Sequence, residues 1–321
     1  MVSSTRLSDS TTLTTATATI SNSITRGLDK GVTLTPKTYD SPGITDYLQK
    51  AVLVGNTISW AGDWEELASS SGSPAQVVQL ARSTNLKVAI EAQLFSQTTG
   101  QLLRPLDNST IANYESVAVS FAKLYHPDYM AFGIEANILY EKSPSNYSSF
   151  VSLFNRVYSQ VKSVSSNTTI FTIFQLERME GLQGGLYGGS DNANPEWSLI
   201  NDFRMDVVGF TTYPDLIFKD PSEIPQNYYS QIQLHTTLPV VFTEIGWHSS
   251  QSPSGWESSP QEQTQFVSSF FALSSGLHKV LEVWSFLYDQ DSAPVPFNSM
   301  GLFDSTGVAR SAYYTWTNST Q

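Results

Sequence analysis

Residues 240–247 read VVFTEIGW and residues 132–137 read FGIEAN, and in each case a short apolar stretch leads directly into a glutamate. Short runs rich in β-branched and aromatic residues are typical of buried strands. We therefore expect Glu135 and Glu244 to lie at the ends of two strands. Parallel strands of one barrel would bring both side chains to the same rim, although they are far apart in sequence.

The chain on both sides of these segments alternates between short β-branched stretches and longer helical periodicities. Such alternation requires a parallel sheet covered by helices, and eight repeats favour an α/β fold of the (β/α)8 TIM-barrel type. No phosphate-binding glycine fingerprint follows the first strand, which argues against a nucleotide-binding open sheet. The predicted strands are Gly31–Leu34, Thr57–Trp60, Lys87–Leu94, Tyr129–Ile134, Thr169–Phe174, Asp206–Thr212, Pro239–Thr243 and Val280–Phe286. The predicted helices are Ile44–Leu53, Pro74–Thr84, Thr110–Leu124, Tyr147–Val164, Trp197–Phe203, Ser222–Leu234, Pro260–Leu273 and Arg310–Thr317.

The first part of the chain differs in composition from the rest. Residues 1–24 are rich in Ser and Thr and contain few large apolar groups, so we interpret them as an N-terminal arm or linker. An extended strand across the barrel floor is the alternative. We expect residues 25–321 to form a single (β/α)8 catalytic domain, because one barrel commonly takes about 250 residues or more.

The charge balance and the sequons bear on partners and location. A net charge of −12 argues against nucleic acid and favours a neutral substrate. No apolar run is long enough to span a bilayer, and the first residues lack the layout of a signal peptide. We expect a monomeric, secreted, extracellular glycoprotein that does not bind a membrane and whose signal peptide is not present in this chain. Four N-glycosylation sequons support secretion, at Asn108, Asn146, Asn167 and Asn318.

Metal and thiol chemistry find little support in the sequence. There are no cysteines, and His126, His235, His248 and His278 are dispersed without a paired metal-binding motif. We therefore expect no metal and no cofactor. Paired carboxylates, in contrast, are the groups that glycoside hydrolysis uses.

The segment around Glu244 resembles a motif of known enzyme families, and the strand positions of both glutamates match the same group. The segment Thr243–Trp247 resembles the nucleophile segment, Glu-x-Gly-Trp or Glu-x-Gly-Tyr, of family 53 endo-β-1,4-galactanases and family 17 β-1,3-glucanases. These families belong to the clan A glycoside hydrolases, which place an acid/base glutamate after strand four and a nucleophilic glutamate after strand seven. Our strand count puts Glu135 and Glu244 at those two positions. The resemblance covers roughly Gly31–Trp316.

The resemblance implies a retaining mechanism, with polysaccharide degradation by an endo-acting β-glycanase as the expected function. Glu244 would attack the anomeric carbon to form a covalent glycosyl-enzyme, while Glu135 would protonate the departing oxygen and later activate water. Tyr213 is the implied hydrogen-bond donor to Glu244, and hydrogen bonding is expected to keep Glu244 ionised. Trp284 is the implied apolar floor beneath the sugar.

The wider set of predicted substrate-binding residues combines aromatic rings, which suit the apolar face of a sugar, with polar groups for its hydroxyls. Ile134 departs from the family pattern, since it stands where an asparagine normally contacts the 2-hydroxyl; Asn137 or Gln93 are the candidate substitutes. The expected ligand is an oligo- or polysaccharide. The set consists of Trp60, Trp64, Gln93, Asn137, Gln175, Glu177, Tyr213, Trp247 and Trp284.

Two alternatives stay open at this point. The loss of the expected asparagine at Ile134 is compatible with a barrel that binds carbohydrate without cleaving it, or cleaves it weakly. A transglycosidase would use the same two glutamates but pass the intermediate to a sugar instead of water. Turnover separates the first alternative from hydrolysis, and product analysis separates the second. The sequence does not name the glycan.

Overall fold

The computed structural model describes residues 28–191 and 194–319. The predicted arm at residues 1–24 lies outside the described residues. In the described ranges, no helix is both long and apolar enough to cross a membrane.

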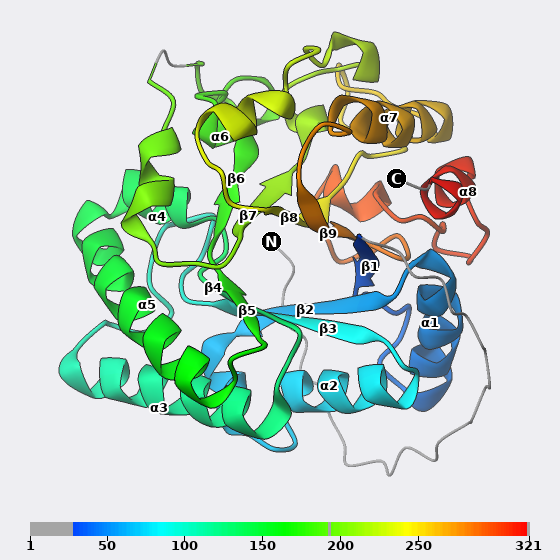
Figure 1. Ribbon diagram of the computed structural model, residues 1–321. Helices are drawn as coiled ribbons and strands as arrows, with labels where there is room; N and C mark the ends of the chain where they lie inside the picture. Colours follow the sequence, from blue (N-terminus) through cyan, green and yellow to red (C-terminus); the bar gives the residue numbers. More distant parts are fainter. Residues whose placement is uncertain (1–27, 192–193, 320–321) are drawn as a thin grey trace.

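The core of the fold is a parallel barrel, which confirms the predicted α/β TIM-barrel class (Figure 1). Its strands follow the order β5-β4-β3-β2-β1-β9-β8-β7-β6. Thr172 alone separates β5 from β6, so these two short strands form one barrel strand with a local break. Around this break, Ile173 N donates to Gly133 O (3.2 Å) and Gly209 N donates to Thr172 O (3.1 Å), which joins the two ends of the sheet. The strands are β1 (Asp29–Thr33), β2 (Thr57–Asp63), β3 (Lys87–Gln93), β4 (Tyr129–Phe132), β5 (Thr169–Phe171), β6 (Ile173–Gln175), β7 (Val208–Thr212), β8 (Val240–Ile245) and β9 (Lys279–Trp284).

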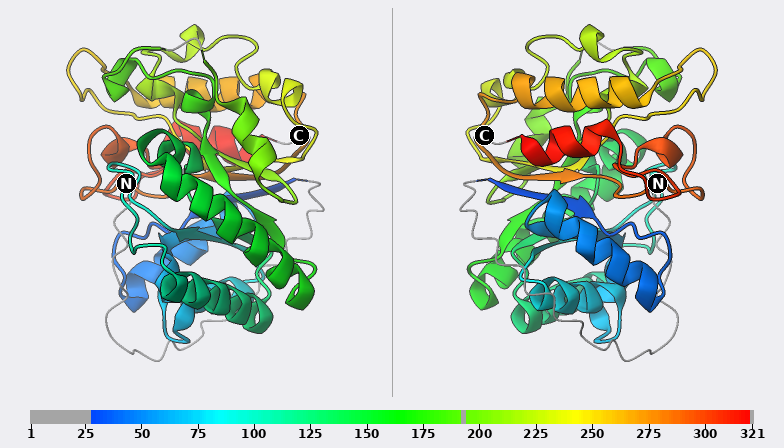
Figure 2. Two further views of the ribbon diagram at one scale, coloured as in Figure 1. Left: turned by 90° about the vertical axis from the view of Figure 1, so that its left-hand side faces the viewer. Right: turned by 90° about the vertical axis from the view of Figure 1, so that its right-hand side faces the viewer.

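Helices surround this barrel on the outside (Figures 1 and 2). Side-chain caps close the first turn of two of them: Asp107 accepts from Thr110 N at 2.8 Å, and Ser259 accepts from Glu262 N at 3.2 Å. The α-helices are α1 (Ser41–Val54), α2 (Ser73–Ser83), α3 (Asn108–Tyr125), α4 (Ala136–Lys142), α5 (Pro144–Val164), α6 (Leu176–Met179), α7 (Pro260–Leu273) and α8 (Ser311–Asn318). The 3₁₀ helices are η1 (Trp64–Ala68), η2 (Gly185–Tyr187), η3 (Trp197–Asp202), η4 (Pro214–Leu216), η5 (Pro221–Glu223), η6 (Ser230–Leu234) and η7 (Phe297–Ser299).

Two predicted α-helices are wrong in type. The stretch Trp197–Phe203 forms only η3, and Ser222–Leu234 divides into η5 and η6. Pro225 explains the second case, because proline inside a helix removes a backbone donor and clashes with the preceding turn. Short 3₁₀ turns satisfy the backbone there instead.

The amino-terminal end of the barrel is fixed by an ion-paired cluster. The carboxylate of Asp29, at the start of β1, accepts from Lys87 Nζ (2.7 Å), Asn56 Nδ2 (2.7 Å) and the Tyr129 hydroxyl (2.5 Å). Lys87 and Tyr129 begin β3 and β4, so one buried carboxylate connects three strands. This end of a TIM barrel contributes stability rather than catalysis.

Candidate active site

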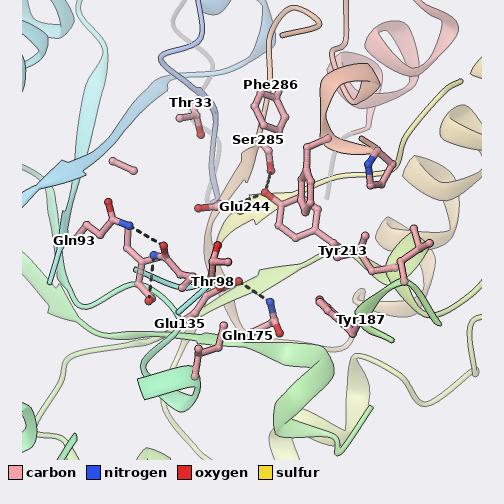
Figure 3. A pocket seen from close by; sticks show the side chains of 18 of the residues that line it. Thr33, Gln93, Thr98, Glu135, Gln175, Tyr187, Tyr213, Glu244, Ser285 and Phe286 are labelled. Atoms are coloured by element: carbon pink, nitrogen blue, oxygen red, sulfur yellow. Dashed lines mark hydrogen bonds between the residues drawn. The ribbon is translucent and has the colours of Figure 1, made fainter. Parts of the chain in front are cut away.

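A cavity of about 690 Å³ opens at the carboxyl ends of the strands (Figure 3). Glu135 and Glu244 both lie on its wall. This is the end of a parallel barrel at which TIM-barrel enzymes place their active sites. The structure therefore brings together the two glutamates that the sequence singled out.

Glu135 follows β4 after two intervening residues and is the N-cap residue of α4, in an unusual backbone conformation. Its φ of 60° and ψ of 50° are left-handed, and Gly133 two residues earlier has a φ of 77°. A non-glycine residue in this region is costly and occurs most often where function requires a fixed orientation. The Oε1 atom accepts from Gln175 Nε2 (2.9 Å) and Thr211 Oγ1 (2.8 Å). These bonds from β6 and β7 hold the nearly buried carboxylate in place.

Glu244 lies near the end of β8, next to an irregularity in the sheet. Phe210 pairs with Phe242 and the next residue, Thr211, pairs with Glu244, so Thr243 forms a bulge against β7. A bulge re-aims the side chain that follows it, and this one presents Glu244 to the cavity. The Tyr213 hydroxyl donates to Glu244 Oε2 at 2.5 Å and lies 2.8 Å from the Ser285 hydroxyl.

The sequence led us to expect that hydrogen bonding keeps Glu244 ionised, but its pKa is raised. Burial and the neighbouring Glu135 raise the pKa of Glu244 to about 7, although the hydrogen bond from Tyr213 lowers it. Burial and the charge of Glu244 raise the pKa of Tyr213 well above its usual value, so its hydroxyl stays protonated and able to donate. The carboxyl of Glu244 therefore titrates near neutral pH under the influence of the neighbouring Glu135.

A third carboxyl lies inside the barrel beside this pair. Glu91 on β3 is buried, and its Oε1 accepts a hydrogen bond from the Ser59 hydroxyl. Burial, followed by the charge of Glu244, raises the pKa of Glu91 well above its usual value. Both effects favour the protonated form of Glu91.

Four of the predicted substrate-binding residues lie on the cavity wall: Trp60, Gln93, Gln175 and Tyr213. Gln93 Nε2 donates to Gln97 Oε1 at 2.7 Å, beside Ile134. An apolar Ile134 side chain thus stands on the wall where the related families carry asparagine, with two glutamine amides nearby.

The prediction that Trp284 forms the floor of the cavity is wrong. Its indole is fully buried between the barrel and the outer helices, within 6.1 Å of the Phe266 ring and 5.5 Å of the Trp316 ring, and Nε1 donates to Met300 O. Because side chains alternate along a strand, the following residue, Ser285, lines the cavity instead. Phe286, which lies beyond the end of β9, also lines the cavity.

Trp64 and Trp247 are also misassigned as substrate platforms. Trp64 is buried against Tyr114, with ring centroids 4.8 Å apart, and Trp247 stacks on Phe266 at 5.1 Å. Neither ring is part of the cavity wall. Both serve as packing between the barrel rim and the covering elements.

Asn137 and Glu177 likewise have structural partners. Asn137 is fully buried, and its amide bonds both backbone groups of Gln175, with Oδ1 to N at 2.9 Å and Nδ2 to O at 3.0 Å. Glu177 accepts from Tyr213 N (2.9 Å) and the Tyr228 hydroxyl (2.8 Å). Asn137 therefore offers no substitute for the missing asparagine, and Glu177 supports the backbone of Tyr213.

Other wall residues were not predicted, among them Gln97, Arg178, Tyr187, Ser285 and Phe286. Most lie in loops after the strands, where no periodicity marks the side chains that turn inward. Ser285 lies in a predicted strand, where side chains alternate between two faces. Both faces of a barrel strand are buried, so the sequence pattern alone does not decide which side chains face the cavity. Within residues 28–191 and 194–319, no cluster of potential metal ligands occurs.

Comparison with solved structures identifies enzymes of similar fold. A family 39 glycoside hydrolase from Bacteroides cellulosilyticus WH2 matches with 18% identity and a TM-score of 0.60, over 91% of this chain and 63% of its own, so this chain spans less than two thirds of that protein. The GH53 catalytic domain of Ignisphaera aggregans matches with 16% identity and a TM-score of 0.63, over 92% and 96% of the two chains. A family 17 β-1,3-glucanosyltransferase from Rhizomucor miehei matches with 9% identity and a TM-score of 0.59, over 89% and 96%.

No protein-family model and no curated protein sequence matches the chain. The structural likeness therefore concerns the fold. It includes families 53 and 17, whose nucleophile segment Thr243–Trp247 resembles. The chain thus has the parallel-barrel fold of clan A glycoside hydrolases, and the resemblance expected from its sequence is confirmed at that level.

Proposed function

We propose that the protein is a retaining glycoside hydrolase that cleaves a neutral β-linked oligo- or polysaccharide, with endo action. The observation that carries this proposal is the convergence of Glu135 and Glu244 on one cavity at the carboxyl ends of the strands. The charge of Glu135 raises the pKa of Glu244, so the two carboxyls lie close enough to interact. A retaining mechanism requires such a close pair, about 5–5.5 Å apart.

Each glutamate has contacts that suit one role. The Tyr213 hydroxyl donates to Glu244 and itself lies 2.8 Å from the Ser285 hydroxyl, which leaves Glu244 positioned to attack an anomeric carbon and form the glycosyl-enzyme. Gln175 and Thr211 fix Glu135, which protonates the departing oxygen and then removes a proton from the attacking water. The raised pKa of Glu244 makes its ionisation, and with it activity, dependent on pH near neutrality.

The cavity wall favours an uncharged substrate. Among the described residues on the wall, the cations are Lys142 and Arg178. Lys142 donates to the backbone carbonyl of Thr98, and Arg178 donates to Glu141 at 2.5 Å, so both already have protein partners. Aromatic and amide side chains make up much of the remaining surface and suit the apolar faces and hydroxyls of sugars.

Secretion and glycosylation are part of the same proposal. The sequon asparagines Asn108, Asn167 and Asn318 are exposed, whereas Asn146 donates to Ser143 Oγ at 2.8 Å and is partly buried. The three exposed sites are accessible to a glycan. Expression in a eukaryotic secretory host, followed by mass measurement before and after enzymatic deglycosylation, tests this; an unchanged mass contradicts glycosylation.

The function itself is tested by release of reducing ends from a panel of β-linked glucans, galactans and mannans, comparing wild type with Glu135→Gln and Glu244→Gln. We expect wild-type turnover, a loss of about 10²–10⁴-fold in Glu135→Gln and a larger loss in Glu244→Gln. Glu223→Gln, an exposed glutamate that bonds Lys219 N, is the matched control and keeps full activity.

The same assay separates the alternatives. Binding of a glycan without turnover supports a carbohydrate-binding barrel, and longer products at high acceptor concentration support transglycosylation. Turnover that survives in both Gln variants contradicts the paired-carboxylate mechanism.

A further inference from the structure

One side of the cavity carries three buried polar atoms that have no hydrogen-bond partner among the described residues. They are Oε1 of Gln175, Nε of Arg178 and the hydroxyl of Tyr187, and all three side chains line the cavity. Gln175 ends β6, Arg178 lies in α6 and Tyr187 ends η2, so one short stretch of chain supplies the whole group. Figure 3 shows Gln175 and Tyr187 on the Glu135 side, with Ser285 and Phe286 beyond Glu244.

The side chains in this group are held in fixed positions. Gln175 is only 6% exposed; its Nε2 donates to Glu135, and its backbone is bound on both sides by Asn137. Arg178 donates from Nη1 to Glu141 at 2.5 Å, and its guanidinium lies 5.3 Å from the centre of the Tyr187 ring. The unpartnered atoms are therefore presented by groups that are already anchored elsewhere.

The backbone that brings Tyr187 to the wall is equally specific. Gly185 has a φ of 55°, and a Cβ added there would lie 2.2 Å from the carbonyl oxygen of Leu216. The backbone amides of Gln183 and Gly184 both donate to Asp191 Oδ1 at 2.9 Å. Only glycine permits the close approach of Gly185 to Leu216. This approach and the turn anchored by Asp191 bring the chain back to the cavity after α6.

The chemistry of the three atoms matches hydroxyl groups. Gln175 offers an acceptor, Arg178 a donor, and Tyr187 a hydroxyl that does either. Each sugar hydroxyl can donate one hydrogen bond and accept others, so adjacent hydroxyls can satisfy all three. Leaving such buried groups unpaired costs free energy, which a bound hydroxyl recovers. Because Glu141 pairs the charge of Arg178, a carboxylate is not the ligand that this wall favours.

We infer that Gln175, Arg178 and Tyr187 form a subsite for the hydroxyl groups of the saccharide that leaves. This inference rests on the proposed function, in which Glu135 protonates the departing oxygen. Gln175 bonds directly to Glu135, whereas Glu244 is held by Tyr213, whose hydroxyl contacts Ser285 on the other side. A sugar bound beside Glu135 and away from Glu244 is therefore the leaving one. The enzyme favours saccharide leaving groups over aryl alcohols of the same glycone.

The test compares kcat/KM for two substrates that share a glycone: an unsubstituted β-linked oligosaccharide and the 4-nitrophenyl glycoside. We expect Tyr187→Phe and Arg178→Lys each to lower the ratio of the oligosaccharide value to the aryl value by about tenfold or more. Tyr314→Phe removes one phenolic hydroxyl from an exposed side chain outside the cavity wall and leaves the ratio unchanged. Thermal midpoints confirm that each variant is folded.

An equal fall for both substrates means that the residues act structurally and overturns the subsite, as does an unchanged ratio. A wild type that hydrolyses neither class overturns the proposed function instead, so the two failures are distinct. A second measurement needs no variant: wild type is assayed on oligosaccharides in which single hydroxyls of the leaving sugar are replaced by hydrogen. A tenfold loss for at least one supports the subsite, and uniform rates contradict it.

Discussion

The carboxylates at the two ends of the barrel differ in the kind of group that they bind. At the amino-terminal end, Asp29 receives a lysine, an amide and a phenol, and its charge is compensated. At the carboxyl end, Glu135 and Glu244 receive hydrogen bonds from neutral groups, namely an amide and hydroxyls. The first arrangement fixes a charge and connects strands. The second leaves two neighbouring carboxyls, of which Glu244 changes protonation near neutral pH.

This contrast teaches that burial alone does not identify a functional acid. Asp29 and Glu135 are almost equally buried, with 6% and 8% exposed. The difference lies in the partner: Asp29 has the Lys87 ammonium at 2.7 Å, whereas Glu135 is bound by an amide and a hydroxyl and acts on a second carboxyl, Glu244. The following four predictions test the contrast, from the largest expected effect to the smallest.

Removing the paired acid at the amino-terminal end is expected to reduce stability without changing catalysis. Asp29→Ala loses the bonds to Lys87, Asn56 and Tyr129, which we expect to lower the free energy of unfolding by about 2–4 kcal/mol. Urea titration measures the loss. Exposed Asp291→Ala is the control, within about 0.5 kcal/mol of wild type. A fall in kcat of the folded variant at unchanged stability would remove the distinction between the two ends.

Removing the neutral donor at the carboxyl end is expected to affect catalysis instead. Tyr213→Phe loses the bond to Glu244, and we expect kcat to fall by about tenfold or more. Because that bond lowers the pKa of Glu244, its loss raises this pKa further, and the acidic limb of the kcat/KM profile moves to higher pH. The pH profile is the measurement. A limb that stays in place, or moves to lower pH, contradicts the role of Tyr213.

His248 tests an exception, because it supplies a cation to an acid at the carboxyl end. Its Nδ1 lies 2.7 Å from Asp215 Oδ2 and its Nε2 2.8 Å from Trp256 O, so both ring nitrogens face acceptors. Burial lowers the pKa of His248, but Asp215 and the Trp256 carbonyl raise it more, so the net pKa is above its usual value. The resulting stability is present below about pH 6.5 and is lost as the pH rises through the raised pKa.

His248→Gln removes this pH dependence. We expect the thermal midpoint of wild type to fall between pH 6 and pH 9 by more than that of the variant. The extra fall corresponds to about 1 kcal/mol in the free energy of unfolding. The exposed-site variant Asp291→Ala serves again as the control and follows wild type. Equal pH dependence in wild type and His248→Gln shows that the ion pair does not contribute.

The last expected effect concerns Glu91, the buried carboxyl inside the barrel. Since its pKa is raised by burial and by Glu244, the stability that its protonated form contributes is fully present below about pH 4.5 and is lost as the pH rises toward the raised value. Glu91→Gln is neutral at all pH values and keeps an oxygen for Ser59. We therefore expect the variant to be more stable than wild type at pH 8 and equal to it at pH 4. Urea midpoints at both pH values measure this, and a less stable variant at pH 8 contradicts a raised pKa at Glu91.

The barrel and the positions of Glu135 and Glu244 were accessible from sequence because they depend on local patterns. Glu244 lies near the end of a strongly apolar strand and Glu135 shortly after another, and parallel strands share one functional end. The break at Thr172 and the bulge at Thr243 were not accessible, since they arise from the way neighbouring strands pair. The helix α4, which begins at once after Glu135, is short and gave no periodic signal.

The aromatic residues show where sequence reasoning fails. Trp60 reached the cavity wall, but Trp64, Trp247 and Trp284 pack between barrel and helices. A tryptophan at a strand end can point either way, because both faces of a barrel strand are buried and both accept an apolar ring. The Gln175, Arg178 and Tyr187 wall depends on a glycine turn and on contacts between loops, which no pattern in the sequence expresses.

The most direct test of the central claim is covalent trapping. Wild type is incubated with a panel of 2-deoxy-2-fluoro β-glycosides that carry good leaving groups, and the digested protein is analysed by mass spectrometry. The account predicts one glycosyl adduct on the peptide that contains Glu244, and none at that position in Glu244→Gln. An adduct on another residue of the wild type, or hydrolysis of the natural substrate with inversion of the anomeric configuration, would contradict it.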